Sequence, residues 1–226
     1  MYLVCIQYVF KWFGLAGYIE GNISIQQLSV VFAVLGGQFY NFGVIGQTAL
    51  TQLYYTSTSA ELINVTATIS NFVLNSSSFG NVGSLIGFNY AKWCLIQHAA
   101  VNGSNISSSS HIGGIAGRQY GYISNSLPNC ILLVQNVTVQ NSNFTATNQN
   151  IGGFFGYVIN TQISISTSSV NSIKIYGTQF FGIFNGIKQS AIQSIDTSFS
   201  TGQNYINDVL QTNCPNYQST ASISGC

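Results

Sequence analysis

The acidic side chains are the first candidates for chemistry, because paired carboxyl groups can cleave glycosidic bonds or hold calcium. A glycoside hydrolase needs two carboxyl groups within about 10 Å of each other. The chain of 226 residues has four carboxylate side chains, at Glu20, Glu61, Asp196 and Asp208. They are far apart along the chain; Asp196 and Asp208 are near enough to share a neighbourhood, but both suit solvated turns. We therefore expect no catalytic residue and predict that the protein is not an enzyme.

Two Cys and two His residues are the second candidate, because thiolate and imidazole groups are the usual ligands of zinc. They are Cys94, His98, His111 and Cys130. Four ligands suffice for a tetrahedral ion, but their spacing matches no compact zinc module. We favour a buried Cys94 beside a partly exposed His98, since both occupy positions expected of stacked strands. No Walker, Rossmann, HExxH or GxSxG motif is present. The sequence thus predicts no metal and no cofactor.

The remaining cysteines bear on disulfides. The five Cys are odd in number, so Cys5 has no assured partner. Cys214 and Cys226 bound the stretch CPNYQSTASISGC, which differs in composition from the rest of the chain. We expect residues 206–226 to be the start of a Cys-containing module or a C-terminal tail, with a possible Cys214–Cys226 disulfide.

Two features of the sequence bear on carbohydrate. Tyr54–Tyr55 and Phe180–Phe181 are possible platforms for sugar rings, although core or coil-stacking roles are favoured for them. N-x-S/T sequons occur at Asn22, Asn64, Asn75, Asn102, Asn105, Asn136 and Asn143. Composition alone would give about five such sequons, so they are weak support for glycosylation. Stacked Asn ladders along a repeat structure are the structural alternative.

The composition indicates which elements must position these residues. Hydrophobic residues make up 46% and aromatic residues 13% of the chain, whereas charged residues make up 4%. An ordinary domain has roughly 25% charged residues, so solubility here depends on Ser, Thr, Asn and Gln. Ile, Val, Thr, Phe and Tyr are abundant, which predicts an all-β protein. The five scattered cations argue against nucleic-acid binding, and no apolar run is long enough for a transmembrane helix.

A short motif recurs along the chain and sets the expected architecture. Its pattern is Gly, large apolar, apolar, Gly. The six copies are Gly14-Leu15-Ala16-Gly17, Gly43-Val44-Ile45-Gly46, Ser84-Leu85-Ile86-Gly87, Gly114-Ile115-Ala116-Gly117, Gly153-Phe154-Phe155-Gly156 and Gly182-Ile183-Phe184-Asn185. In the last copy Asn replaces the final Gly, and Asn is the next-best residue for a positive φ.

The motif spacing alternates between about 30 and 40 residues, which suggests a longer unit near 70 residues. Such a unit accommodates about three solenoid turns of roughly 23 residues. The stretches between motifs alternate apolar and polar residues and end in Asn/Ser clusters, as expected of half-buried strands and their corners. Each strand is expected to be covered by its neighbours in the next coil. The glycines would allow tight corners and close approach of stacked backbones. We predict a parallel β-solenoid over residues 13–205, preceded by a partial repeat at 1–12.

The stretch IGGIAGRQYGYISNS at 112–126 resembles the GLUG motif, G-L-V-G-x-N-x-G-x-I-x-N-C/S. Its matching residues are Gly114, Gly117, Gly121, Ile123, Asn125 and Ser126. Gln119 replaces the usual Asn. The first copy keeps the same offsets at Gly17, Gly21 and Ile23. The other copies keep mainly the glycine core, so the resemblance depends on recurrence.

The resemblance implies a structural repeat of large surface or secreted proteins, often adhesin-like and stacked as a β-solenoid. We therefore expect a non-catalytic structural or adhesive segment, extracellular or at the cell surface, whose partners would be cell-surface glycans or proteins. A carbohydrate-binding or carbohydrate-active β-helix is the alternative, and a truncated gene product without independent function is another. The apolar N-terminus lacks the features of a signal peptide and leads directly into a repeat, so we expect a fragment of a longer array.

Overall fold

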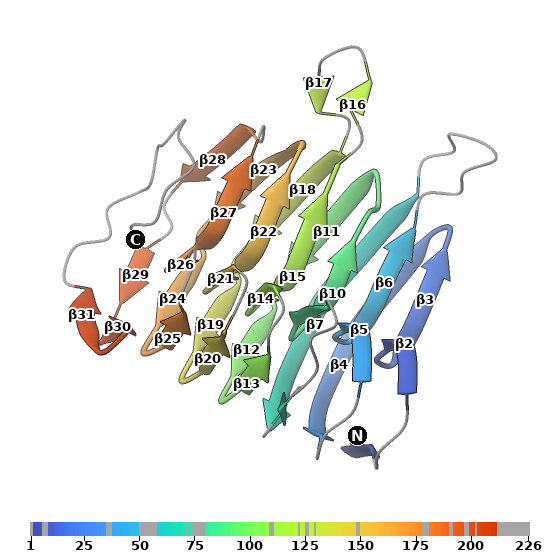
Figure 1. Ribbon diagram of the computed structural model, residues 1–226. Coiled ribbons are helices and arrows are strands. Elements are labelled where there is room, and N and C mark those ends of the chain that lie inside the picture. The colour runs from blue at the N-terminus through green and yellow to red at the C-terminus, as the bar shows by residue number, and fades with distance from the viewer. Residues whose placement is uncertain are drawn as a thin grey trace.

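A computed structural model shows an all-β chain whose strands stack as a parallel β-solenoid (Figure 1), which confirms the predicted fold class. The residues it describes are 2–5, 9–34, 38–49, 58–70, 72–73, 80–108, 111–121, 123–124, 127–128, 130–147, 150–177, 181–189, 192–196, 199–201 and 203–211. Within these ranges no helix is long and apolar enough to cross a membrane.

The coils stack so that their strands form four walls, and most coils contribute two strands to the longest of them. Two walls flank the repeated motif, and we name them by their place in the repeat. The lead sheet comprises β2 (Val9–Phe13), β5 (Gln38–Phe42), β9 (Asn81–Gly83), β14 (His111–Gly113), β21 (Ile151–Gly152) and β26 (Phe181–Gly182). The motif sheet comprises β3 (Ala16–Glu20), β6 (Ile45–Ala49), β10 (Ile86–Asn89), β15 (Ala116–Tyr120), β22 (Phe155–Ile159) and β27 (Asn185–Gln189).

The other two walls complete each coil. The long sheet comprises β1 (Tyr2–Cys5), β4 (Ile23–Val34), β7 (Ser59–Ser70), β11 (Trp93–Gln97), β12 (Ala100–Asn102), β18 (Cys130–Gln135), β19 (Thr138–Gln140), β23 (Thr161–Ser166), β24 (Ser169–Asn171), β28 (Ile192–Asp196) and β29 (Phe199–Thr201). The return sheet comprises β8 (Phe72–Val73), β13 (Asn105–Ser108), β20 (Asn143–Ala146), β25 (Lys174–Gly177), β30 (Asn204–Ile206) and β31 (Val209–Gln211). Every pairing between coils is parallel, and β31 then turns back antiparallel onto β30.

The strand registers show that one motif corresponds to one coil. Val82 pairs with Ile112 across the shorter motif interval, and Ile112 pairs with Ile151 across the longer one. The longer interval contains a hairpin of β16 (Ile123–Ser124) and β17 (Leu127–Pro128) that projects from the stack between β15 and β18 (Figure 1). A plain coil and a coil with an insertion thus make up the long period. The expected division of that period into three shorter turns is therefore wrong.

The sixth copy of the motif is shifted by one residue relative to the sequence alignment. Gly182 pairs with Gly152, which precedes the fifth motif, and Phe155 pairs with Asn185. The backbone N–H of Phe154 donates to the carbonyl of Phe184 at 2.9 Å, as Ile115 does to Phe154. Gly186, rather than Asn185, is therefore the equivalent of the final motif glycine.

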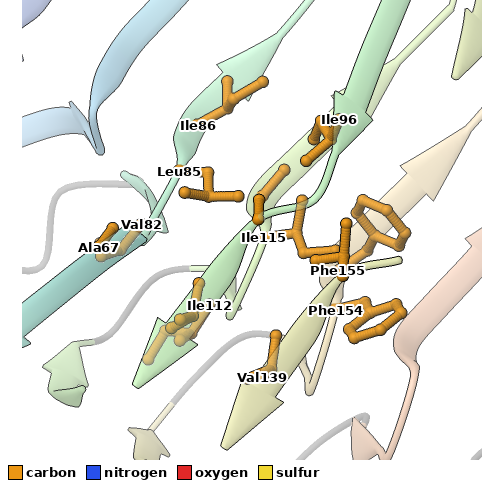
Figure 2. Close-up of a cluster of buried hydrophobic side chains, with 14 of the residues drawn as sticks. Ala67, Val82, Leu85, Ile86, Ile96, Ile112, Ile115, Val139, Phe154 and Phe155 are labelled. Atoms are coloured by element: carbon orange, nitrogen blue, oxygen red, sulfur yellow. The ribbon is translucent and has the colours of Figure 1, made fainter. Parts of the chain in front are cut away.

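The core is built from the second position of the later motifs and from alternate residues of the long sheet, whereas Leu15 at the second position of the first motif is exposed. Val44, Leu85, Ile115, Phe154 and Phe184 occupy that second position, and all are buried. Figure 2 shows Leu85, Ile115 and Phe154 in a row from successive coils. β7 alternates buried and more exposed residues on either side of a break at Asn64, as predicted for half-buried strands. Each fully buried aliphatic or aromatic side chain contributes roughly 1.5–3 kcal/mol.

The motif glycines are needed for close approach and not for a positive φ. Among the described glycines only Gly21 and Gly103 have positive φ, so the predicted role of the motif glycines in left-handed corners is wrong. A Cβ on Gly156 would lie 2.6 Å from the Gly117 carbonyl oxygen and 2.8 Å from the Ile112 nitrogen. Since both atoms belong to the backbone of the neighbouring coil, no side chain can be accommodated there. The predicted close approach of stacked backbones is confirmed.

The coils turn instead at polar residues with positive φ. One column of such residues divides the long sheet and contains Gln27, Asn64, His98, Asn136 and Thr167, with φ between 52° and 55°. A second column, Gly103, Asn141 and Ser172, separates the long sheet from the return sheet. Asn and Gly adopt this conformation at low cost. These two columns, with the exposed residues beside them, are called the polar bends below.

Candidate functional site

The acidic residues lie toward the two ends of the solenoid. Glu20 ends β3 and Glu61 lies in β7 of the next coil, opposite Ser24. Asp196 ends β28, four coils further on. Asp208 lies in the turn between β30 and β31, where its carboxylate accepts a hydrogen bond of 2.7 Å from the Tyr176 hydroxyl. That bond raises the pKa of Tyr176. Within the described ranges no three His, Cys, Asp or Glu side chains gather as a metal site would require.

The four candidate zinc ligands lie on different parts of the coil. Cys94 and Cys130 are buried thiols in β11 and β18, and burial raises the pKa of Cys94 to about 12. His98 is exposed at a polar bend, where its Nδ1 lies 2.7 Å from the Asn136 amide. His111 belongs to the lead sheet. The predicted arrangement of a buried Cys94 and an exposed His98 is confirmed.

Several sequence candidates lie outside the described residues. These are Tyr54, Tyr55, Phe180, the sequon at Asn75 and both members of the possible disulfide, Cys214 and Cys226. Phe181 belongs to β26. The predicted leading repeat at 1–12 contributes β1 and most of β2, and the predicted tail from residue 206 begins at the last residue of β30.

A buried amide ladder shows that some polar residues have a structural role. The Thr48 hydroxyl donates to the side-chain Oδ1 of Asn89 at 2.7 Å, and the side-chain Nδ2 of Asn89 donates to Oε1 of Gln119 at 2.7 Å. Gln119 continues to the Thr161 hydroxyl at 3.4 Å. This column runs through successive coils at the corner between the motif sheet and the long sheet. The interpretation of stacked amides as ladders therefore holds for these residues, and Asn102, which heads a sequon, also accepts a hydrogen bond of 3.0 Å from the side-chain amide of Asn141 in the next coil.

Arg118 occupies the outer face of the motif sheet and is surrounded by aromatic rings. The register places it between Phe88 of the preceding coil and Tyr157 of the following coil. Its guanidinium carbon lies 5.5 Å from the Phe88 ring centroid, 5.2 Å from that of Tyr157 and 5.4 Å from that of Tyr120. Tyr90 stacks on Tyr120 with centroids 5.0 Å apart. All five side chains are half-buried, so the group faces solvent at its outer edge.

His111 completes this group from the adjacent wall. Its ring lies 5.1 Å from that of Tyr157, and its Nδ1 is buried without a hydrogen-bond partner. Burial and the nearby Arg118 lower the pKa of His111 to about 4. The imidazole is therefore neutral at physiological pH. We call Phe88, Tyr90, His111, Arg118, Tyr120 and Tyr157 the Arg118 cluster.

The charge of Arg118 is not compensated by its surroundings. Residues 62–195 contain no Asp or Glu, so the coils around Arg118 lack an acidic side chain. Its Nε is buried without a hydrogen-bond acceptor, and the guanidinium lies against aromatic rings. A guanidinium has five N–H donors in a planar fork that matches carboxylate geometry. The cluster can thus bind an anion beside an apolar ring.

The Arg118 cluster was not predicted from the sequence, although the spacing of its residues from the motifs pointed to it. Phe88, Arg118 and Tyr157 each lie four residues after the start of a motif, and Tyr90 and Tyr120 each lie six residues after one. Equal offsets from equivalent motif positions become neighbours on one face once each motif starts a coil. The expectation of shorter turns obscured that relation.

Comparison of the chain with protein-family models, with curated proteins and with solved structures finds no match.

Proposed function

We propose that this chain is a non-catalytic, adhesive segment of a cell-surface or secreted protein, in which the solenoid displays the Arg118 cluster as a contact site. The observation that carries the proposal is an uncompensated cation that contacts three aromatic rings, one of which stacks on a fourth, on an outer wall. Buried structural charges are normally paired. A partly exposed Arg without an acidic partner, beside Tyr and Phe, has the composition of an interaction hot spot.

The solenoid suits adhesion because its outer walls are extended and regular. Each coil contacts its neighbours through parallel ladders, so the Arg118 cluster is held by three successive coils and not by a loop. A site on strands is more precisely positioned than one on loops. The dispersion of Glu20, Glu61 and Asp196 along the axis supports a binding role over a hydrolytic one.

The proposed surface or secreted location is supported by composition and by the GLUG resemblance. Solubility without many charges requires hydroxyl and amide groups, and these line the polar bends on the outside of the long and return sheets. Repeats of the GLUG type belong to surface and secreted proteins, which is where an adhesive solenoid would act.

Binding of the purified, fluorescently labelled chain to a glycan microarray and to fixed cells tests the proposal. We expect retention of the wild-type chain and at least about a tenfold loss for the double variant Arg118→Gln, Tyr157→Ala, since each interaction contributes about 1 kcal/mol or more. Lys174→Gln is the matched control, because Lys174 is a cation over the Tyr205 ring on the return sheet. Equal retention of the double variant and the wild type would contradict the proposal, as would no retention of the wild type.

Carbohydrate binding is the form of adhesion that the aromatic rings favour. Tyr90 and Tyr120 are nearly parallel, with an angle of 25° between their planes. Flat aromatic faces pack against the apolar C–H faces of sugar rings.

A further inference from the structure

We propose that the Arg118 cluster binds a saccharide that carries a carboxylate, such as a uronic or sialic acid. This inference rests on the proposed adhesive function and names the ligand class of the same site. The carboxylate would accept hydrogen bonds from Arg118, and the sugar ring would pack on the tyrosine pair.

The guanidinium is held in place before any ligand arrives. Phe88 and Tyr157 flank it from the coils on either side, and Tyr120 lies beside it on its own strand. These contacts orient the group through ring faces rather than through its N–H donors. A preorganised Arg loses less conformational entropy on binding, and it can donate two parallel hydrogen bonds to one carboxylate.

The protein itself supplies no competing carboxylate near the site. The acidic residues closest in sequence are Glu61 and Asp196, and both belong to the long sheet. A positive charge without a nearby negative charge attracts anions. The apolar rings beside it reduce the screening of this charge by water. The ligand is therefore expected to be anionic, and a neutral sugar would leave the charge unmatched.

The ring arrangement favours a saccharide over an acidic peptide. Tyr90 and Tyr120 form a stacked pair, and Phe88 lies 5.9 Å from Tyr90 and 6.4 Å from Tyr120. These rings lie on the face of a sheet whose backbone groups are already paired with β6 and β22. An extended peptide would bind best at an unpaired strand edge, which this face does not offer.

Isothermal titration with matched acidic and neutral sugars tests the inference. The probes are tetragalacturonate beside its methyl ester, and sialyllactose beside lactose, so that uronic and sialic acids are distinguished. We expect at least one acid to bind about tenfold or more tightly than its neutral partner, because a charge-assisted hydrogen bond is about twice as strong as a neutral one. Arg118→Gln should abolish the preference, Arg118→Lys should restore part of it, and Lys174→Gln should leave it unchanged.

Each outcome separates this inference from the proposed function. Equal binding of acid and neutral sugar, or an unchanged preference in Arg118→Gln, overturns the acidic ligand but leaves an adhesive role. Binding of neither pair overturns the inference, while retention on fixed cells still reports adhesion to another partner. Far-ultraviolet circular dichroism of each variant confirms that its coils are intact.

A second inference comes from a different observation: we infer that the exposed sequons on and beside the long and return sheets accept N-linked glycans. The described sequon residues are all exposed, at Asn22, Asn64, Asn102, Asn105, Asn136 and Asn143. The buried Asn residues are Asn41, Asn89, Asn150, Asn160 and Asn204, and none of them heads a sequon. This separation is unexpected if sequons arise from composition alone.

The strand pattern explains why these sites tolerate a glycan. In Asn64-Val65-Thr66 and Asn136-Val137-Thr138 the central Val is fully buried, so the Asn projects outward at its bend. None of the described sequon residues lies in the lead or motif sheet. Glycans would therefore cover the long and return sheets and leave the Arg118 cluster bare.

Expression through a eukaryotic secretory pathway tests this second inference, which also depends on the proposed extracellular location. The intact mass should fall after treatment with peptide N-glycosidase F in ¹⁸O water, and the released sites should become labelled Asp at the exposed sequons. Asn141 and Asn207, which are exposed outside any sequon, are the internal controls. An unchanged mass, with a co-expressed glycoprotein processed normally, overturns the inference and leaves the binding experiments above unaffected.

Discussion

The motif sheet and the polar bends both stack from coil to coil, but they do so with different kinds of residue. At the motif, glycine lets the backbones of neighbouring coils approach closely. At the bends, most residues carry a polar side chain. At Gly156 a backbone oxygen and nitrogen of the preceding coil leave space for hydrogen alone. At Asn136 the chain turns through a positive φ and the side chain projects outward.

This difference teaches where the repeat can vary. Close backbone approach leaves no room for a side chain at the final motif position, so glycine recurs there through to Gly186, whereas Ser84 occupies the first position in one copy. The bends need only a residue that tolerates positive φ, and Gln, Asn, His and Thr all occur there. Functional groups can therefore accumulate on outward positions of either region without disturbing the stack.

Replacement of a motif glycine should cause the largest loss of stability. Gly156→Val is expected to lower the free energy of unfolding by at least about 4 kcal/mol, because its Cβ would meet the backbone of the neighbouring coil. Gly103→Ala at a bend has open space around its Cβ and should cost about 1 kcal/mol, from its φ of 68° alone. Urea unfolding followed by circular dichroism measures both, and similar losses would refute the distinction.

The buried amide ladder should matter more than an outward one. Asn89→Ala removes a side chain with no solvent exposure and leaves polar partners at Thr48 and Gln119 unsatisfied, which should cost about 3 kcal/mol. Gln97→Ala breaks the partly exposed bond to Gln135 at 3.3 Å and should cost less than about 1 kcal/mol. Chemical denaturation compares the two, and a larger loss for Gln97→Ala would reverse the assignment.

His111 of the lead sheet should make the stability of the fold depend on pH. Its pKa of about 4 lies below the ordinary value of 6.5, so the unfolded chain binds a proton first as the pH falls. Stability should be fully present above about pH 6.5 and decline by about 3 kcal/mol as the pH falls to about 4.

His111→Phe should remove this part of the pH dependence, whereas His98→Asn at the bend is the control for loss of an imidazole. Unfolding free energies measured from neutral to mildly acidic pH give the comparison. Equal pH profiles for His111→Phe and the wild type would exclude the assignment to His111.

The cation–π contacts of Arg118 should make a modest contribution to stability. Arg118→Gln is expected to cost about 1 kcal/mol, since three rings lose their cation. Lys174→Gln loses a single, more exposed contact and should cost less than about 0.5 kcal/mol. Thermal unfolding ranks the two variants, and the reverse ranking would indicate that the rings do not hold Arg118.

Replacement of a bend residue should have the smallest effect on stability, and it should increase stability. Thr167 has a φ of 52°, which is costly for a β-branched residue. Thr167→Asn places there the residue found at Asn64 and Asn136, and it should stabilise the chain by about 0.5 kcal/mol. A lower urea midpoint for this variant would show that other contacts of Thr167 outweigh its backbone strain.

The sequence by itself determined the class of structure. Recurrent Gly-apolar-apolar-Gly segments and alternating strands specify stacked, half-buried β-coils, because a strand with one apolar face must be covered by its neighbour. The second motif position is buried in every copy from Val44 onward, and the expected close approach of backbones occurs at Gly156. These properties are local, so residue type and spacing suffice to predict them.

The tertiary structure alone decided the register. The length of a coil, the shift at Gly182, the insertion after β15 and the meeting of Phe88, Arg118 and Tyr157 all depend on hydrogen bonds between residues of neighbouring coils, far apart in the sequence. The longer motif interval has the same appearance in sequence whether it is a longer coil or a plain coil with a projecting hairpin. Only the parallel ladders, which pair each residue with one partner in the next coil, distinguish the two and place the cation among its rings.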